Sequence, residues 1–488
     1  MKAVLFRTMV FTHRWVGIAI GWLMLMWCLS GIVMLYVQYP DLTQSERLAH
    51  LEPLRVDRCC TAQNVPLAAT ARIASFSMEM LDGSLLLRLM PEGGAVVLLE
   101  PETGSVVDTV TSELALRVAA AWKGTNGAAA TVEGPQARPD QWTVYPRYGA
   151  TRPLYHVDLH DDAGTELYVS SRTGEVVQKT TRTQRFWNWL GAVPHWLYFT
   201  RIRDNAPLWN NLVIYSSLLG CFLTLFGLYL GIWQLRRGPD TRLYSPHRGW
   251  KYWHHVPGLI FGVLVLSWVF SGLMSMQPWG FLESDGIEAE ARQVRGGLPE
   301  WQEVQRVLQR LPMAELPADT VRISSSILGG KLHVLATDRG GGRMRFDAQW
   351  QPSPLSAEEI GQAGQALGAV RVATLQQEDE FYYAFASSVA SLPVVRLTMA
   401  DDTRIYMDPV TGDLRTKIDS AARGYRWLHL GLHRLDFTAG MRRRPVWDVL
   451  VWTLLLGATS VSITGVWLGV RYLRRRSRVP AEQDSARV

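Results

Sequence analysis

Histidines at corresponding points of the chain are the residues best suited to chemistry. His13 and His254 each stand at the start of a long apolar segment, and His195 and His433 each precede another such segment. A further histidine, His429, lies one helical turn before His433. Neutral imidazole nitrogens are common ligands of metal ions and of haem iron. We therefore take these five histidines as the candidate cofactor-binding residues.

Glycines follow two of these histidines at helical spacing. The positions four and eight residues after His13 and His254 are occupied by Gly17, Gly21, Gly258 and Gly262. On a helix these positions share the face of the imidazole. A face without side chains predicts room for something flat and wide, such as a haem ligated by the histidine. Ordinary helix packing through small residues is the alternative interpretation.

An internal repeat relates the histidines to one another. Residues 13–31 align without gaps on residues 254–272, and residues 189–237 align without gaps on residues 427–475. Each alignment matches one candidate histidine with another. We therefore expect a tandem duplication of span, outer domain and span, with the two halves related by a pseudo-two-fold axis along the membrane normal.

The duplication is expected to bring like histidines together at two levels. His13 and His254 would form an inner pair, and His195 and His433 an outer pair. Histidine in or near a span indicates a functional role, and two axial imidazoles on one iron give a haem suited to electron transfer. The sequence thus predicts two bis-histidine haems. Structural histidines, a non-haem metal site and a proton path are the alternatives.

Four almost uncharged windows must position these residues. Each is long enough, at about 1.5 Å per residue, to cross a hydrocarbon core about 30 Å thick. The windows are residues 15–37, 206–235, 256–280 and 446–470. We expect an α-helical membrane protein with four transmembrane helices.

Lysine and arginine set the expected orientation. They gather at the amino terminus, in the short loop between the second and third windows, and after the fourth window. Such segments stay in the cytoplasm, so both termini are expected inside and both long loops outside, in the periplasm of a bacterium with this chain in its inner membrane. The formal charge of +6 follows from this asymmetry and gives no argument for nucleic acid.

Both long loops predict α+β domains. Thr-Gly turn signals follow apolar strands at Gly104, Gly174 and Gly412, where glycine suits a positive φ. Helix-like stretches cover residues 298–311 and 356–367. The expected fold of each loop is therefore a helix followed by a few antiparallel strands.

The expected domain boundaries follow the chain in order. They are a cytoplasmic amino terminus with the first span (1–37), the first periplasmic domain (38–184), an interfacial helix with the second span (185–237), a cytoplasmic loop (238–255), the third span (256–280), the second periplasmic domain (281–422), an interfacial helix with the fourth span (423–472) and a cytoplasmic tail (473–488).

The remaining candidates carry less chemistry. Cys59 and Cys60 are adjacent, a spacing that strains their mutual pairing, and nothing in the sequence supplies a redox partner. On a strand, His156, Asp158 and His160 would share one face, as a weak metal site or, more simply, as a solvated surface. Motifs for dinucleotides, for nucleotide phosphates and for attachment of c-type haem are absent from the sequence.

The sequence resembles the PepSY-associated transmembrane proteins, a family that includes iron-regulated inner-membrane proteins and ferric-siderophore reductases. The resemblance covers nearly the whole chain. It rests on His13-Arg14-Trp15 followed by Gly17 and ending in Ser30-Gly31, on Trp427-Leu428-His429 followed by His433, on Thr464-Gly465 before Trp467, and on the Thr-Gly turns.

This resemblance implies PepSY-like periplasmic domains and haem b held by His13, His195, His254 and His433. It also implies electron transfer from a cytoplasmic flavin reductase or quinol to a ferric chelate outside, with a ferric siderophore as the expected substrate. No catalytic acid or base is needed. Gly191 stands where the second half has His429, so the choice between His429 and His433 as the outer ligand stays open.

Two other classes of protein compete with a reductase. A membrane-anchored PepSY binding or regulatory protein, acting on a periplasmic peptidase or an envelope partner, would use the spans as anchors and hold no haem. A transporter would suit the duplicated architecture, but the four windows contain almost no ionisable residues near their centres.

Overall fold

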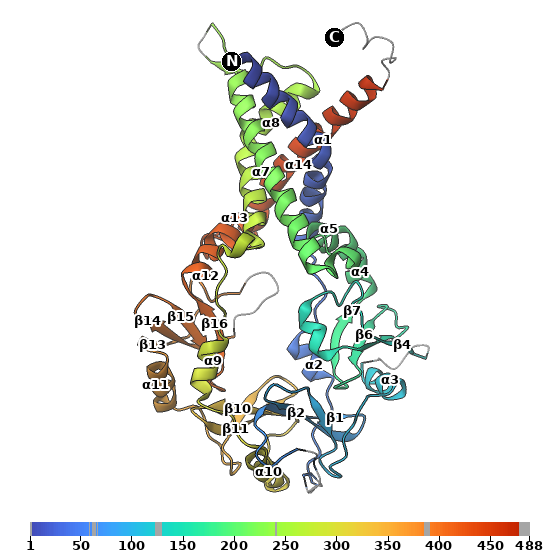
Figure 1. Ribbon diagram of the computed structural model, residues 1–488, viewed down its shortest axis with the longest axis vertical. Coiled ribbons are helices and arrows are strands. Elements are labelled where there is room, and N and C mark those ends of the chain that lie inside the picture. Colours follow the sequence, from blue (N-terminus) through green and yellow to red (C-terminus); the bar gives the residue numbers. More distant parts are fainter. Residues whose placement is uncertain are drawn as a thin grey trace. The chain divides into compact units, whose positions relative to one another are not determined.

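Two compact units make up the chain. The computed structural model describes residues 2–57, 59–60, 65, 67–122, 129–239, 242–384 and 391–477. The membrane unit consists of residues 1–39, 186–283 and 421–488, and the sheet unit consists of residues 40–185 and 284–420 (Figure 1).

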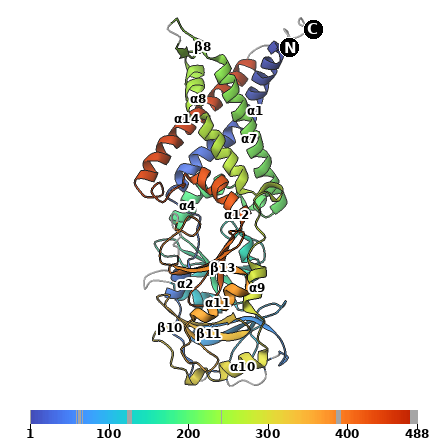
Figure 2. The same cartoon turned by 90° about the vertical axis from the view of Figure 1, so that its left-hand side faces the viewer.

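Four long helices dominate the membrane unit. They are α1 (Lys2–Met34), α7 (Ala206–Gln234), α8 (Trp250–Ser275) and α14 (Val446–Arg476). Each is long and apolar enough to cross a membrane, where a helix satisfies its backbone groups internally. Helices α1 and α8 each contact both α7 and α14, so the four close into a bundle (Figures 1 and 2). The chain is a membrane protein.

Two of these helices differ in length from the apolar windows. Helix α1 begins at Lys2, so His13 lies about three turns inside the helix and not at its end. Helix α8 ends at Ser275, before Gln277 adopts a left-handed conformation with φ of 46°, whereas the third window ran to residue 280. Hydropathy marks the apolar stretch, but helical hydrogen bonding continues into charged sequence and stops at such a backbone conformation.

Short elements flank the bundle. Before α7 lie α4 (Arg182–Leu190), α5 (Ala192–His195) and α6 (Thr200–Arg203). Before α14 lie α12 (Ser420–Tyr425), a π-helical turn (Arg426–Gly431) and α13 (Leu432–Arg434). A two-stranded ribbon of β8 (Arg236–Arg237) and β9 (Leu243–Tyr244) lies between α7 and α8.

The sheet unit contains a six-stranded antiparallel sheet to which both halves of the sequence contribute. Its order is β12-β11-β10-β1-β2-β3. The strands are β1 (Ile73–Leu81), β2 (Ser84–Pro91), β3 (Val97–Leu99), β10 (Thr320–Leu328), β11 (Lys331–Asp338) and β12 (Arg343–Phe346). The start of β1 is separated from that of β10 by the same interval as the start of β2 from that of β11. In the middle of the sheet, β1 pairs with β10.

Two four-stranded antiparallel sheets complete the strands of this unit. One has the order β4-β5-β6-β7 and the other β13-β14-β15-β16. The strands are β4 (Thr131–Gln136), β5 (Leu154–Asp158), β6 (Glu166–Ser170), β7 (Val176–Thr180), β13 (Ala369–Leu375), β14 (Val394–Met399), β15 (Arg404–Met407) and β16 (Leu414–Ile418). Helix α3 (Ser112–Ala120) contacts β4 and β5, and α11 (Ala357–Ala366) contacts β13. These are α+β regions.

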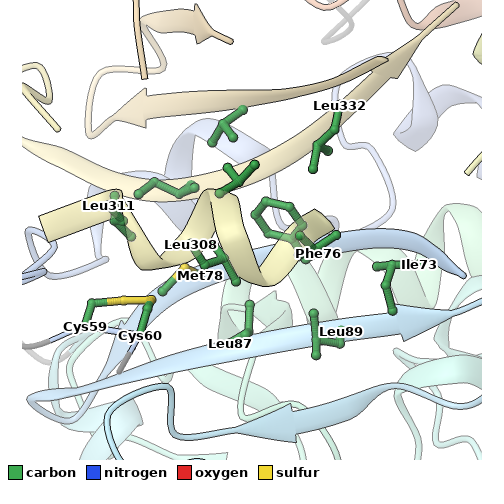
Figure 3. Close-up of a cluster of buried hydrophobic side chains, with 14 of the residues drawn as sticks. Cys59, Cys60, Ile73, Phe76, Met78, Leu87, Leu89, Leu308, Leu311 and Leu332 are labelled. Carbon is green, nitrogen blue, oxygen red and sulfur yellow. A yellow bond between two sulfur atoms is a disulfide. The ribbon is translucent and has the colours of Figure 1, made fainter. Parts of the chain in front are cut away.

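The six-stranded sheet carries the largest apolar core. Helix α10 (Trp301–Gln309) buries Val304 and Leu308 among sheet residues such as Phe76 and Met78 (Figure 3). Cys59 and Cys60 form a disulfide at the edge of this cluster. Two further short helices belong to the unit, α2 (Gln44–Ala49) and α9 (Glu288–Arg295).

The Thr-Gly turns begin the last strands of the four-stranded sheets. Gly174 and Gly412 have φ values of 70° and 77°, which glycine adopts without strain. A Cβ atom at Gly174 would meet Leu81 of β1, and one at Gly412 would meet Leu328 of β10. Both turns therefore need glycine for conformation and for space.

Candidate functional site

His13 and His254 face each other inside the helix bundle. His13 lies on α1 and His254 on α8, and their ring centres are 6.4 Å apart with an angle of 41° between the planes. His13 Nδ1 lies 3.0 Å from the carbonyl oxygen of Leu223 on α7. His254 Nδ1 lies 3.2 Å from the carbonyl oxygen of Val461 on α14. Each imidazole is thus held by a helix other than its own.

These contacts fix the tautomer of both rings. A carbonyl oxygen only accepts hydrogen bonds, so Nδ1 of His13 and of His254 must carry the proton. The lone pair of each Nε2 atom is then available to a ligand. A metal-ligating histidine is usually oriented in this way, by donation from its other nitrogen to a carbonyl or carboxylate.

His195 and His433 form a second facing pair. They lie on α5 and α13, with ring centres 6.1 Å apart and planes at 71°. His195 Nδ1 lies 3.1 Å from Ser30 Oγ and 3.2 Å from the carbonyl oxygen of Trp27. His433 Nδ1 lies 3.0 Å from Ser271 Oγ. The serines are buried, at 2% and 0% exposure, so their contacts with the rings are shielded from water.

Matching indole hydrogen bonds fasten α5 and α13 to the bundle. Trp209 Nε1 of α7 donates to the carbonyl oxygen of Trp196 at 2.8 Å. Trp447 Nε1 of α14 donates to the carbonyl oxygen of Arg434 at 2.7 Å. Each acceptor directly follows a histidine of the outer pair, which restrains the position of that histidine.

The two pairs are far apart along the same helices. The ring of His195 lies against Gly31 of α1, and Gly31 follows His13 by about five helical turns. At a pitch of about 5.4 Å per turn, the levels of the two pairs differ by about 27 Å. That distance is close to the thickness of a hydrocarbon core, about 30 Å.

His429 adjoins the outer pair from one side. Its ring centre is 5.3 Å from that of His433, and its Nδ1 lies 2.9 Å from the carbonyl oxygen of Ser271. It belongs to the π-helical turn, a distortion that is frequent at functional sites. A buried ion pair between Arg426 and Asp436, 2.6 Å long, holds this turn. The structure thus brings all five predicted histidines into two groups, His13 with His254 and His195 with His433 and His429.

The glycines in contact with the inner rings are not those singled out by their spacing. A Cβ atom at Gly227 would lie 2.8 Å from His13 Cε1, and one at Gly465 would lie 3.1 Å from His254 Cε1. By contrast, Gly17 lies against Leu223 and Gly21 against Val466. Side chains of neighbouring helices therefore pack over Gly17 and Gly21, and Leu228 packs over Gly262, whereas nothing lies within 4 Å of an added Cβ atom at Gly258. The repeat contained Gly227 and Gly465 as matched positions, which was the available signal.

The other histidines do not form a metal site. His160 lies beyond the end of β5, with a φ of 51°, and bonds to Thr131, while His156 pairs with Glu166 at 3.1 Å. His160 remains in contact with Asp158, at 3.3 Å from Nδ1 to Oδ1, but it no longer shares the strand face of His156 because the chain leaves the strand after Asp158. Among the described residues, no group of three or more His, Cys, Asp or Glu is placed to hold a metal ion.

The fold and the paired histidines define a class of protein: a four-helix membrane protein with facing imidazoles at two levels and an attached α+β unit. The model of the family described as the PepSY-associated TM region matches residues 11–309. The chain belongs to this family. A search of curated proteins finds none whose sequence matches it.

Proposed function

We propose that this protein is a di-haem reductase that carries electrons across the membrane to a ferric chelate. One haem b would be held by His13 and His254 and a second by His195 and His433. The observation that carries this proposal is the presence of two facing imidazole pairs, 6.4 and 6.1 Å between ring centres, with Nδ1 of each ring engaged by the protein.

The spacing of the rings fits two ligands of one metal ion. Two imidazoles that held one metal ion through Nε2, with bonds of about 2.0 Å, would have ring centres up to a little over 6 Å apart. Both pairs have this spacing.

The residues around the rings support a stable low-spin site. The carbonyl oxygens of Leu223 and Val461 orient the inner imidazoles and raise the basicity of Nε2. The buried Ser30 and Ser271 do the same for the outer ones. With two imidazole ligands, a haem supplies one-electron transfer without binding oxygen.

The direction of transfer rests on the distribution of charge. Arginines and lysines flank the ends of the spans that carry the amino and carboxyl termini, which supports a cytoplasmic location for both termini in a bacterial inner membrane. The inner pair would receive electrons from a flavin reductase or from quinol, and the outer pair would deliver them. The sheet unit would lie in the periplasm.

The proposed substrate is a ferric chelate, with a ferric siderophore preferred on the basis of the family resemblance. One electron converts ferric to ferrous iron, which hard oxygen donors hold far more weakly. No proton or covalent bond has to move, so the protein needs no catalytic acid or base. The ferric chelate does not have to bind to the outer histidines either, because an electron tunnels to a chelate that is bound nearby.

We also propose that the chain arose by tandem duplication of a span, a PepSY-like domain and a span. Support comes from the equal spacing of the β1–β2 and β10–β11 strands. Further support comes from Leu223 and Val461, the acceptors of the inner histidines, which are matched positions in the sequence repeat.

Haem content tests the proposal. The detergent-purified protein should show sharp reduced α bands, and its pyridine haemochrome should give two haems per chain. His13→Ala and His433→Ala should each remove one haem, whereas the control His160→Ala, in the sheet unit, should remove none. A colourless protein from haem-replete cells would reject the reductase and favour a membrane-anchored regulator of a peptidase or envelope partner.

A further inference from the structure

The sheet unit contains two clefts at corresponding places in the two halves of the chain. The first is lined by α2, the end of β1 and the turn at Gly174, and has about 60 Å³ of free volume. The second is lined by α9, the end of β10 and the turn at Gly412, and has about 260 Å³. When the starts of helices α2 and α9 are aligned, Arg47, His50 and Leu51 correspond to Ala291, Val294 and Arg295.

Buried ion pairs fill the first cleft. Glu79, which is 1% exposed, pairs with Arg47, with Arg88 at 2.9 Å and with Arg322 at 3.0 Å. Arg47 also pairs with Glu175 at 2.9 Å. The three arginines and two glutamates of this cluster occupy the first cleft and neutralise most of one another's charge, although the buried Nη1 atom of Arg47 has no hydrogen-bond partner in the described part of the chain.

The second cleft has lost this cluster. Ala291 and Ser326 stand at the positions equivalent to Arg47 and Glu79. Leu335 and Ser75 stand at those equivalent to Arg88 and Arg322. Only Asp413 retains the charge of its counterpart, Glu175. Ala291 and Ser326 leave space where the first copy has long side chains. A carboxylate that paired with an arginine in one copy thus lacks that arginine in the other.

Polar groups of both signs border the enlarged cleft. Arg295 and Asp413 interact electrostatically, but in the described part of the chain no salt bridge joins them. Ser325 Oγ accepts a hydrogen bond from the Phe76 backbone N–H at 3.0 Å, which leaves its own hydroxyl proton free to donate. Ser326 Oγ donates to the carbonyl oxygen of Thr411 at 2.8 Å. The oxygen of this hydroxyl can still accept a hydrogen bond from a ligand.

We propose that the second cleft binds a small zwitterionic molecule of the amino-acid or short-peptide class. Its carboxylate would bond to Arg295, its ammonium group to Asp413, and its amide groups to the serine hydroxyls. An apolar side chain would pack on Val294 and Ile327, which also line the cleft. The free volume of about 260 Å³ is close to the lower end of the range of about 300–1,000 Å³ that is usual for small-molecule sites. This inference is independent of the proposed haems.

Calorimetry with the full-length protein in detergent tests the inference, with alanyl-leucine as the probe. The free dipeptide should bind saturably, and capping either terminus should weaken binding by about tenfold or more, because each charge-assisted hydrogen bond is lost. Arg295→Ala and Asp413→Asn should weaken binding of the free dipeptide to a similar extent. Arg292→Ala, on the exposed face of the same helix, should leave it unchanged.

A double variant that introduces the charged residues of the first cleft into the second cleft provides the sharpest control. Ala291→Arg combined with Ser326→Glu places an arginine and a glutamate where Arg47 and Glu79 stand in the other half, and should abolish binding while the thermal unfolding temperature is kept or raised. Absence of saturable binding to the unaltered protein, or equal binding by this double variant, would overturn the assignment.

Discussion

Ser77 of β1 pairs with Ser324 of β10 at the centre of the six-stranded sheet, and each serine is the fifth residue of its strand. The two serines are therefore equivalent positions in the two halves of the chain. Strand pairing that matches a residue with its own counterpart puts a local two-fold axis through that pair. The sheet unit is thus built around one shared sheet, and differences between its halves can be compared position by position.

Glu79 should be essential for the stability of this shared sheet. Removing one partner of a buried ionic cluster leaves the other charges uncompensated, which costs about 3–5 kcal/mol. Glu79→Gln should therefore lower the free energy of unfolding by about that amount, as measured by chemical denaturation of the full-length protein in detergent. Asp82→Asn, which breaks a partly exposed pair with Arg117, is the control and should cost at most about 1 kcal/mol.

The same carboxylate predicts a dependence of stability on pH. Burial alone would raise the pKa of Glu79, but Arg88, Arg47 and Arg322 outweigh it and lower the pKa to about 2. A depressed pKa in the folded state adds stability above the unfolded pKa of about 4.3, and this stability is lost as the pH falls toward 2. Between these values the unfolding free energy of Glu79→Gln should change less with pH than that of the unaltered protein. Parallel curves of unfolding free energy against pH for the two proteins would contradict the assignment of this pH dependence to Glu79.

Two tyrosine–aspartate pairs should contribute equally in the two halves. Tyr406 Oη donates to Asp379 at 2.7 Å, and Tyr168 Oη donates to Asp140. Each bond to a carboxylate is worth about 1.5–3 kcal/mol, so Tyr406→Phe and Tyr168→Phe should each lower the free energy of unfolding by about 2 kcal/mol. Tyr382→Phe, whose hydroxyl bonds at an exposed site, should have a smaller effect. A much larger loss in one half would show that the pairs are not equivalent.

Gly227 should be required for haem at the inner level. An added Cβ atom would lie 2.8 Å from His13 Cε1, closer than van der Waals contact permits, so Gly227→Ala should displace the imidazole and lower the haem content toward one per chain. Gly258→Ala is the matched control, because nothing lies within 4 Å of its added Cβ atom. Equal haem content in the two variants would remove His13 from the proposed ligand set.

His433 should be the outer ligand and His429 should not. His433 faces His195 as His254 faces His13, whereas the first half has Gly191 at the position of His429. His429→Ala should therefore retain two haems, measured by pyridine haemochrome, and His433→Ala should retain one. Loss of a haem from His429→Ala, with retention in His433→Ala, would reverse the assignment.

The histidine pairs could be predicted because they repeat in the sequence and because the spans fix their levels. The glycines that contact the inner rings were not singled out from the sequence, since spacing along one helix does not reveal which neighbour packs against it. Gly17 shares a face with His13, yet the close contact comes from Gly227 on another helix. Packing between helices depends on their rotation about their axes, which a repeat leaves undetermined.

The six-stranded sheet shared by the two halves of the chain could not be predicted from the sequence either. The Thr-Gly turns and the apolar segments before them indicate strands within each loop, but the pairing of β1 with β10 joins segments about half the chain apart. Unpaired edge groups of two short sheets are satisfied when the sheets join, and local sequence does not say which edge meets which. The paired serines and the diverged clefts therefore became visible only in the folded unit.

Electron transfer across a sealed membrane tests the central claim most directly. Proteoliposomes loaded with an impermeant reductant and bathed in a ferric siderophore should release ferrous iron outside, detected with a ferrous-specific chelator. His13→Ala and His433→Ala should each reduce the rate to that of protein-free vesicles, with His160→Ala unchanged. Ferrous iron formed at the same rate by the histidine variants as by the unaltered protein would contradict a path through the two histidine pairs.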